Sequence, residues 1–308
     1  MKNFIFRKSI SIVATLFVVV TVTFLLMKFI PGDPFQDEQA LPFEIHQSLL
    51  KHYGLDESLP KQYFRYVLSV IRWDFGPSFV YKGRSVNQLI SQGFPISFLL
   101  GAEAIFIALG SGLIIGTVSG MKKNKWVNNL SLLFVILGLS IPNFACATFL
   151  QYFLAVKYHI FPVARWGSFI HSILPALSLA ALPAAFIAKL VRAQIEDVLQ
   201  QGYIKTAIAK GLNEKQVMFK HVLRNALLPV VAYLGQITAN ILVGSFVIEK
   251  IYSIPGLGQL FVNSVISRDY TAIMGLTVFY SLLLVSTVLV FDILSTFLDP
   301  RLRVSYEY

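Results

Sequence analysis

Long apolar runs alternate with polar stretches along the whole chain. A helix crosses the hydrocarbon core of a bilayer with about 20 consecutive apolar residues. Six runs meet this requirement, at residues 9–27, 96–118, 130–156, 173–190, 227–248 and 272–298. The pattern predicts an all-α integral membrane protein with six transmembrane helices, in which the first and fourth helices are followed by long loops.

The first run also has features of a secretory signal peptide, because three basic residues lie within the first eight positions. The run is long for the core of such a signal, and residues 28–31 offer no pair of small side chains for cleavage. We therefore interpret it as an uncleaved first helix, with a cleaved signal as the alternative.

Composition supports a membrane protein. Hydrophobic residues make up 56% of the 308 positions and charged residues only 14%, whereas a typical soluble domain has about 25% charged residues. Two soluble domains would need even more polar surface than one. The single cysteine, Cys146, excludes an intrachain disulfide bond.

The distribution of Lys and Arg predicts the orientation in the membrane. With the N-terminus in the cytoplasm, the inner segments are 1–8, 119–129, 191–226 and 299–308. These segments contain 14 Lys and Arg residues, and the short outer loops 157–172 and 249–271 contain 4. This is the inside-positive bias of membrane proteins, so both termini are predicted to be cytoplasmic. The same bias explains most of the net charge of +10, which therefore indicates no nucleic-acid partner.

The first long loop, residues 31–94, lies on the outer side in this topology. Two stretches within it, 43–51 and 62–73, have the spacing of short helices with aromatic faces. They predict a small subdomain packed on the outer ends of the spans. A cover that binds no partner is the alternative.

The second long loop, residues 191–226, predicts two helices on the cytoplasmic side. The first covers 194–209 and ends before Gly211, because glycine readily adopts the left-handed conformation that follows many helices. Asn213 and Gln216 form a capping-box pattern that begins the second helix.

The second helix of this loop has apolar positions at helical spacing, which predict one apolar face. These positions are Met218, Phe219, Val222, Leu223 and Ala226. The face needs a partner, either this protein's own helices or another protein. A helix–turn–helix tied to the membrane at both ends is not expected to bind DNA.

The lysines of the same loop recur every five residues, a step of about 140° around a helix. They are Lys205, Lys210, Lys215 and Lys220. We expect them to surround the helices, as the inside-positive bias requires, and not to form one anion-binding stripe.

Short motifs carry more specific information. The inner loop contains YIKTAIAKGL at 203–212 and HVLRNALLP at 221–229. Five more stretches occur along the chain: PGDP at 31–34, DFG at 74–76, SIPGLG at 253–258, SRDY at 267–270 and LDPRLR at 298–303. Together they resemble the permeases of ABC importers, in particular the first permease subunit of the oligopeptide, dipeptide and nickel transport family.

The resemblance implies a type I ABC importer permease architecture with a cytoplasmic coupling-helix loop. Such a subunit pairs with a second homologous permease over two ABC ATPase subunits, and an extracytoplasmic solute-binding protein delivers the substrate. ATP and Mg²⁺ bind to the ATPases. We expect no cofactor on this chain, which has no GxxxxGK[ST] nucleotide loop.

The resemblance also implies the location and the segments. The expected location is the bacterial cytoplasmic membrane, with the chain crossing the lipid bilayer several times. The expected segments are an N-terminus with the first helix at 1–30, an outer subdomain at 31–95, a five-helix core at 96–298 and a cytoplasmic tail at 299–308.

In this family ATP closes the ATPases, and the coupling loop passes that motion to the spans, which alternate between inward and outward openings. The docking element is expected at 207–223, with Gly211 setting the angle between its helices. The positions expected to couple to the ATPase are Lys205, Thr206, Ala207, Ala209, Gly211, Leu212, Val217, Met218, His221, Arg224, Asn225 and Pro229. Sugar-type permeases have Glu-Ala-Ala where this chain has 205–207, so no loop carboxylate is expected to pair with the ATPase.

Polar and ionisable residues inside spans are candidates for the translocation pathway. Glu103 lies roughly 10 Å from the outer end of the second predicted span. Gln236 and Asn240 lie in the fifth. For Glu103, a hydrogen bond to a neighbouring helix or to bound water is the alternative.

The expected function is therefore half of the translocation pathway of an ATP-driven peptide importer, not an enzyme. One alternative is a secondary transporter or channel driven by an ion gradient, which would more often show internal repeats and charges at the bilayer midplane. Another is a membrane-embedded enzyme, but the five histidines are scattered and form no metal-binding motif. The substrate stays open among oligopeptides, dipeptides, murein peptides, glutathione and nickel.

Overall fold

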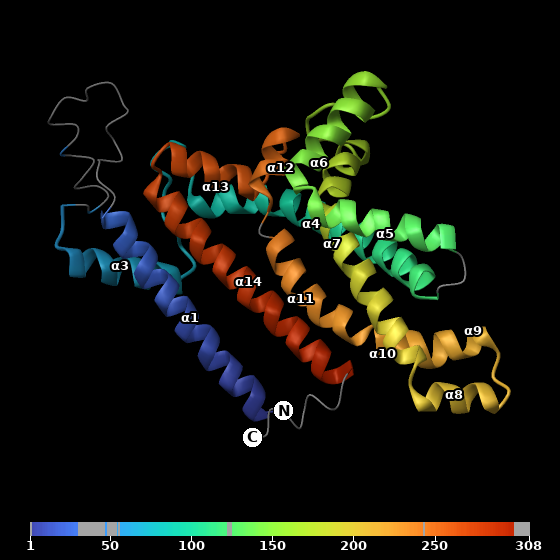
Figure 1. The fold of residues 1–308 in the computed structure, drawn as a ribbon. Coiled ribbons are helices and arrows are strands. Elements are labelled where there is room, and N and C mark those ends of the chain that lie inside the picture. The colour runs from blue at the N-terminus through green and yellow to red at the C-terminus, as the bar shows by residue number, and fades with distance from the viewer. Residues whose placement is uncertain are drawn as a thin grey trace. The chain divides into compact units, whose positions relative to one another are not determined.

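The computed structural model describes residues 2–29, 56–121, 125–242 and 244–298, together with Gln47 and Gly54 (Figure 1). The chain divides into two compact units. The first unit comprises Met1–Pro95 and Gly256–Val285, and the second comprises Ile96–Pro255 and Ser286–Tyr308. Helical structure dominates the described residues of both units, as the apolar pattern predicts.

Among its described residues, the first unit contains three whole helices and the beginnings of two longer ones. The whole helices are α1 (Lys2–Phe29), α3 (Leu59–Ile71) and α13 (Leu257–Ile266), and the longer ones are α4 (Val86–Gly120) and α14 (Tyr270–Leu298). Helix α3 confirms the predicted helix at 62–73 and begins three residues earlier, because extended Ser58 and the following Pro60 favour a helix start. The other predicted outer helix, 43–51, lies outside the described ranges.

Apolar side chains from each part of the first unit form its core. The buried members are Val20, Phe75, Val86, Ile90, Leu257, Ala272, Leu276 and Val278. Helix α14 approaches the start of α4 closely at Gly275, where an added Cβ would lie 2.8 Å from Val86 Cγ1 and 2.9 Å from Phe75 Cβ. A side chain at this position would therefore push the two segments apart.

A buried carboxylate fastens the segment before α4 to the start of α14. Asp269 is fully buried. Its Oδ1 accepts hydrogen bonds from the backbone N–H groups of Phe79 and Ala272, at 3.2 and 3.1 Å. Its Oδ2 accepts from the Ser78 hydroxyl and from the Val80 N–H group. Several hydrogen bonds to one carboxylate offset the cost of burying its charge.

The second unit is built around one central helix. Helix α7 (Phe169–Leu199) has 15 buried residues. It contacts α5 (Lys125–Ser140), α6 (Asn143–Leu150) and α11 (Leu228–Leu242). The remaining elements are π-helix η1 (Gln151–Lys157), α8 (Gly202–Ala209), α9 (Glu214–Val217), π-helix η2 (Met218–Val222), α10 (Leu223–Ala226) and α12 (Phe246–Ile251).

Glycines at every fourth position let α4 approach α7 closely. An added Cβ would lie 2.9 Å from the Ala184 carbonyl oxygen at Gly112, and 2.7 Å from the Ala188 carbonyl oxygen at Gly116. At Gly120 it would lie 2.9 Å from Ile195 Cβ. This small-xxx-small spacing is typical of helices that pack in membranes.

The structure confirms the membrane-spanning character and corrects the course of two predicted spans. Within the described parts of the chain, four helices are long and apolar enough to cross a bilayer without interruption: Phe6–Phe29, Val86–Gly120, Phe169–Leu199 and Tyr270–Phe297. The described residues contain six spans only if two bent pairs of helices each count as one.

The run at 130–156 is one of these bent pairs. Helix α5 ends at Ser140, and the segment Asn143–Lys157 continues at an angle of 109°. Pro142 lies at the break, where its missing N–H group and its effect on the preceding residue disfavour a continuous helix. The run is therefore not one continuous helix, and it counts as a single span only as a bent pair.

The run at 227–248 is also not a single helix. It begins at a 45° bend between Glu214–Ala226 and α11, beside Pro229. Helix α11 ends at Leu242, and Gly244 has a φ of +93° before α12 begins. This left-handed backbone conformation ends the helix at residue 242, six residues before the predicted end at 248.

Candidate coupling site

Helix α8 ends in a hydrogen-bonded turn centred on Gly211. The Gly211 N–H group donates to the Ile208 carbonyl at 2.9 Å, and the Leu212 N–H group donates to the Ala207 carbonyl at 3.3 Å. These two bonds define a Schellman motif, in which the residue after the cap adopts left-handed φ. Gly211 has a φ of +84°. The predicted role of Gly211 as the residue that ends the helix is confirmed.

The second helix of the loop begins as the sequence predicts. Asn213 Oδ1 accepts from the Gln216 N–H group at 2.8 Å, and Gln216 Oε1 accepts from the Asn213 N–H group at 3.2 Å. Both halves of the capping box are therefore formed. Residues 210–213 separate α8 from α9, and each of them takes part in the turn or in the cap. The angle between the two helices is therefore defined locally.

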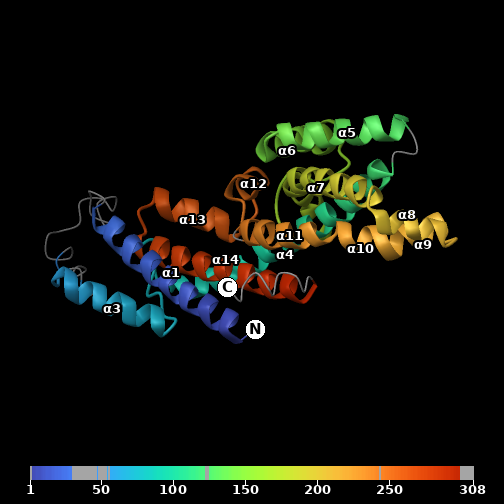
Figure 2. The ribbon, with the colours of Figure 1, turned by 60° about the horizontal axis from the view of Figure 1, so that its bottom comes forward.

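The first helix of the loop differs from its predicted extent, 194–209. Helix α7 continues to Leu199, and α8 begins only at Gly202. Gln201 between them is extended, with φ −69° and ψ 143°. The spanning helix and the loop helix are therefore separate elements, and α8 can turn away from the axis of α7. Figure 2 shows α8 and α9 side by side beyond the end of α7.

One face of the helix pair is buried. Its side chains belong to the core cluster of the second unit: Ile204, Ala207, Val217, Val222 and Ala226. Of the coupling residues predicted from sequence, Ala207 and Val217 lie on this face, and Leu212, Met218, His221 and Pro229 are half-buried. This part of the predicted apolar face packs against the protein's own helices.

The predicted apolar face is wrong at Phe219, whose side chain is 72% exposed. The reason is π-helix η2, which adds one residue to a turn and places residues five apart on the same face. Val217 and Val222 therefore share the buried face, and Phe219 points away from it. Regular α-helical spacing could not reveal this shift.

The remaining surface of the helix pair is exposed and contains both apolar and basic side chains. The exposed apolar side chains are Tyr203, Ile208 and Phe219. Lys205, Lys210, Lys215 and Lys220 are exposed around the helices, as predicted. The remaining predicted coupling residues, which are also exposed, are Thr206, Ala209, Gly211, Arg224 and Asn225.

A hydrogen bond joins the beginning of the loop to its end. Asn225 Nδ2 donates to the Tyr203 hydroxyl at 2.8 Å and to the His221 carbonyl at 3.1 Å. The two helices are thus connected at the turn of Gly211 and again near α10. Such a doubly connected pair is suited to move as one body.

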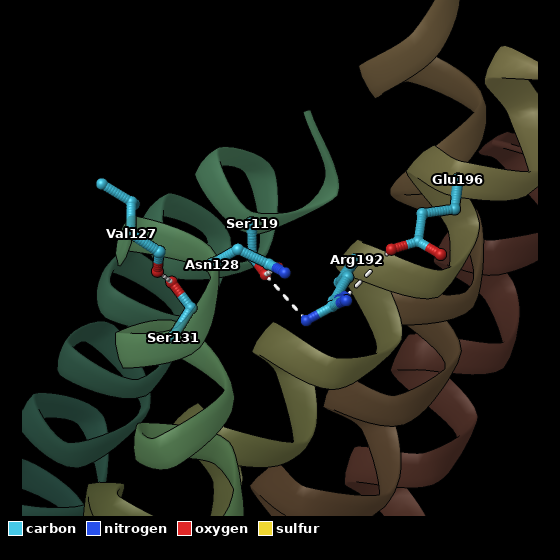
Figure 3. A network of polar contacts seen from close by, with 6 residues as sticks. All are labelled: Ser119, Val127, Asn128, Ser131, Arg192 and Glu196. Atoms are coloured by element: carbon cyan, nitrogen blue, oxygen red, sulfur yellow. Dashed lines mark hydrogen bonds and ion pairs between the residues drawn. The ribbon is translucent and has the colours of Figure 1, made fainter. Parts of the chain in front are cut away.

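A polar network, absent from the predicted site, lies where α4, α5 and α7 meet (Figure 3). Arg192 donates from Nη1 to Ser119 Oγ at 3.1 Å and from Nε to Glu196 Oε1 at 3.0 Å. Ser119 donates to Asn128 Oδ1 at 3.1 Å. The arginine side chain therefore joins α4 to α7 about two turns before the end of α7. The position of Arg192 at the end of an apolar run could have indicated it.

The predicted pathway residues do not form one cluster. Gln236 and Asn240 are exposed one turn apart on α11, whereas Glu103 is half-buried on α4. Helices α4 and α11 meet at Gly101, where an added Cβ would lie 3.1 Å from Ile241 Cγ2. Glu103 lies about 200° around α4 from that contact, so it points away from α11.

A second buried carboxylate, Glu249, is not among the residues predicted from the sequence. Glu249 on α12 is fully buried, and its Oε1 accepts from the Ser97 hydroxyl of α4 at 2.7 Å. The sequence offered one signal for its burial: Glu249 directly follows the apolar run at 227–248.

Two protein-family models match this chain. Residues 112–304 match the family model described as "binding-protein-dependent transport system inner membrane component". Residues 1–100 match the model of the N-terminal part of the membrane component of such systems. The chain belongs to this family. It is the permease subunit of an ABC importer and a multi-pass inner membrane protein, and its role is transport, not catalysis.

Curated relatives cover nearly the whole chain of this family member. It is 45% identical over 98% of its length to the dipeptide transport system permease protein DppB of Bacillus subtilis, of which 98% is covered. It is 38% identical over 98% of its length to the oligopeptide transport system permease protein OppB of Escherichia coli K12, of which 100% is covered. The resemblance stated from the motifs is confirmed.

The chain is also similar in fold to a solved structure. It is described as a crystal structure of an amino acid ABC transporter with histidines, and it matches with a TM-score of 0.54 at 19% identity. The match covers 70% of this chain and 94% of that chain.

Proposed function

We propose that this permease forms half of the translocation pathway of an importer for dipeptides or oligopeptides. The relatives named as dipeptide and oligopeptide permeases support the substrate class, because the similarity extends over 98% of this chain. Nickel and glutathione are the alternative substrates. A second homologous permease would complete the pathway.

The loop formed by α8, α9 and η2 is where we propose that two ABC ATPases transmit force to the permease pair. The observation that carries this proposal is the two-faced helix pair. Its inner face joins the core of the second unit, while Ile208 and Phe219 lie outside that face and are 59% and 72% exposed. Apolar side chains of this size on a protruding loop favour a protein partner.

The polar network at Arg192 would pass this movement to the spans. Arg192 connects α7 to α4, and α4 continues into the packed stripe of Gly112 and Gly116. A rigid displacement of α8 and α9 would therefore move several helices together and change the opening of the pathway.

The exposed stripe of α11 is the best candidate for the pathway lining. Gln236 and Asn240 are exposed in an otherwise apolar helix. Polar side chains in spans usually face a water-filled path or another helix, because lipid offers them no hydrogen bonds. Glu103 lies on the side of α4 that points away from α11. It would line the pathway only if the second permease lies on that side.

The proposed topology follows from the charge distribution and the family. Both termini would be cytoplasmic, the segment 31–95 would lie outside, and 96–298 would form the permease core with the tail 299–308 inside. An extracytoplasmic binding protein would deliver the peptide, and ATP with Mg²⁺ would bind only to the ATPases.

Transport by the purified complex in lipid vesicles tests both parts of the proposal. Uptake of a labelled dipeptide or tripeptide should require ATP and the binding protein and should persist when the proton gradient is collapsed. Phe219→Ser and Ile208→Ser should lower ATP-driven uptake by weakening the ATPase contact, whereas Lys215→Gln, which is exposed on the same loop, should not.

Different failures would contradict different parts. Uptake of nickel or glutathione in place of peptides would refute the substrate class. Normal coupling in the double variant of Phe219 and Ile208 would refute the docking face, even if peptide uptake is confirmed.

A further inference from the structure

Helix α3 has two apolar faces, of which one is used inside the protein. Tyr63, Tyr66 and Val67 face the core of the first unit and contact α1 or the side chains around it. On another side of the helix, Phe64 and Ile71 are 71% and 75% exposed, and Leu68 is also exposed. An amphipathic helix in water would not present these three side chains at helical spacing.

A basic stripe lies directly beside the exposed apolar stripe. At about 100° per residue, Lys61, Arg65 and Arg72 fall within roughly 40° of one another around the helix axis. All three are exposed. Arg65 also forms an ion pair with Glu57 at 2.5 Å. The order around the helix is therefore buried face, exposed apolar stripe and basic stripe.

The contacts with α1 fix the depth of α3. The Tyr63 and Thr21 hydroxyl oxygens are 2.7 Å apart, and the Phe24 ring contacts the Tyr63 and Tyr66 rings at centroid distances of 5.3 and 5.9 Å. The Thr21 hydroxyl donates to the Phe17 carbonyl at 2.8 Å, so Tyr63 is the donor toward Thr21.

These contacts lie inside the membrane-spanning part of α1, which runs from Phe6 to Phe29. Phe24 and Thr21 precede its end by five and eight residues, which corresponds to roughly 8 and 12 Å along the helix. On α1, Leu25 and Leu26 are exposed at the same depth. The exposed apolar stripe of α3 thus continues a surface that already lies in lipid.

We propose that α3 is an interfacial helix of the outer leaflet. Phe64, Leu68 and Ile71 contact acyl chains, and the basic stripe of Lys61, Arg65 and Arg72 binds lipid phosphate groups. The arrangement has the form of a helix lying about 5–10 Å into the boundary between headgroups and acyl chains, with basic residues beside the apolar face. The basic side chains reach the phosphates because their long aliphatic stems can extend toward the surface. A lipid partner accounts for both stripes, whereas a water-exposed position leaves the three exposed apolar side chains unexplained.

Spin-label accessibility in the assembled importer tests this proposal independently of the coupling site. In a Cys146→Ser background, single cysteines replace Phe64, Leu68 or Ile71, and each carries a nitroxide label. The complex is placed in vesicles of phosphatidylethanolamine and phosphatidylglycerol, and each labelled variant is first checked for ATP-driven uptake. Labels at Ser58 and Leu25 serve as the aqueous and lipid references.

The proposal predicts a ratio of oxygen to nickel-chelate accessibility that is several-fold higher at positions 64, 68 and 71 than at Ser58, and close to that at Leu25. High nickel-chelate accessibility at these positions would overturn it by placing α3 in water. Low accessibility to both reagents would also overturn it, because a protein, such as the second permease or the binding protein, would then cover the stripe. Each of the three labelled positions tests the proposal separately. If one variant fails to assemble, the accessibility ratios of the other two still support or overturn it.

Discussion

Replacement of Gly211 by alanine isolates the contribution of the turn between α8 and α9. The backbone of Gly211 has a φ of +84°, and an alanine in this left-handed region costs about 1–2 kcal/mol. No heavy atom lies within 4 Å of the position that an added Cβ would occupy. The cost is therefore conformational and not steric, and it should shift the equilibrium away from the observed turn by about 5–30-fold.

Gly202 provides a matched control on the same loop. It also has no neighbour within 4 Å of an added Cβ, but it is the first residue of α8 and is not among the residues with positive φ. Gly202→Ala should therefore leave the loop intact, since alanine is favoured over glycine in helices by about 1 kcal/mol. Gly211→Asn should be intermediate, because asparagine tolerates the left-handed region better than alanine.

The assay is the number of peptides imported per ATP hydrolysed by the purified complex in vesicles. Gly211→Ala should lower this ratio while membrane insertion and the amount of assembled complex stay unchanged, and Gly211→Pro should lower it further. Equal ratios for Gly211→Ala and Gly202→Ala would refute the reasoning, because the two variants differ mainly in backbone conformation.

Three further substitutions test contacts elsewhere. Arg192→Gln should destabilise the complex by about 1.5–3 kcal/mol, because charged hydrogen bonds are lost, whereas Lys189→Gln one turn earlier on α7 should not; thermal unfolding measures both. Asp269→Asn should accelerate tryptic cleavage of the outer segment, since an amide NH₂ would face backbone N–H donors. Tyr63→Phe should lower the melting temperature through loss of about 0.5–1.5 kcal/mol, whereas Tyr66→Phe should be neutral or stabilising.

The reason for the last contrast lies in the surroundings of the two hydroxyls. Tyr63 donates toward Thr21, while the Tyr66 hydroxyl is buried and has no hydrogen-bond partner among the described residues. Burial raises the pKa of Tyr66, so its hydroxyl stays neutral. Equal melting temperatures for Tyr63→Phe and Tyr66→Phe would contradict the hydrogen bond of Tyr63. Equal melting temperatures for Arg192→Gln and Lys189→Gln would contradict the contribution of the Arg192 network. An unchanged rate of cleavage in Asp269→Asn would contradict the role of the Asp269 carboxylate.

Local features of the coupling loop were predictable from the sequence. The left-handed turn at Gly211 and the capping box of Asn213 and Gln216 depend on residues within a few positions of each other. Backbone preferences and side-chain reach decide such features, and both are properties of short segments. The membrane-spanning character was equally readable, because it depends only on the length and composition of apolar runs.

Exceptions to regular helical geometry were not predictable in the same way. The π-turn of η2 changes which side chains share a face, so Phe219 points outward and Val217 inward. A periodic pattern assumes one helical period, and a single added residue breaks that assumption. The bend at Pro142 had a visible cause in the sequence, but the angle of 109° depends on packing against α7.

The sequence by itself determined that this chain lies in a membrane, that it resembles importer permeases and that the loop at 191–226 has a fixed turn. Only the tertiary structure decided the partners of its buried charges. Asp269 meets Ser78, and Glu249 meets Ser97, across separations of 191 and 152 residues. No local preference encodes such pairs, because they arise when helices distant in sequence pack and leave a carboxylate no water to bind.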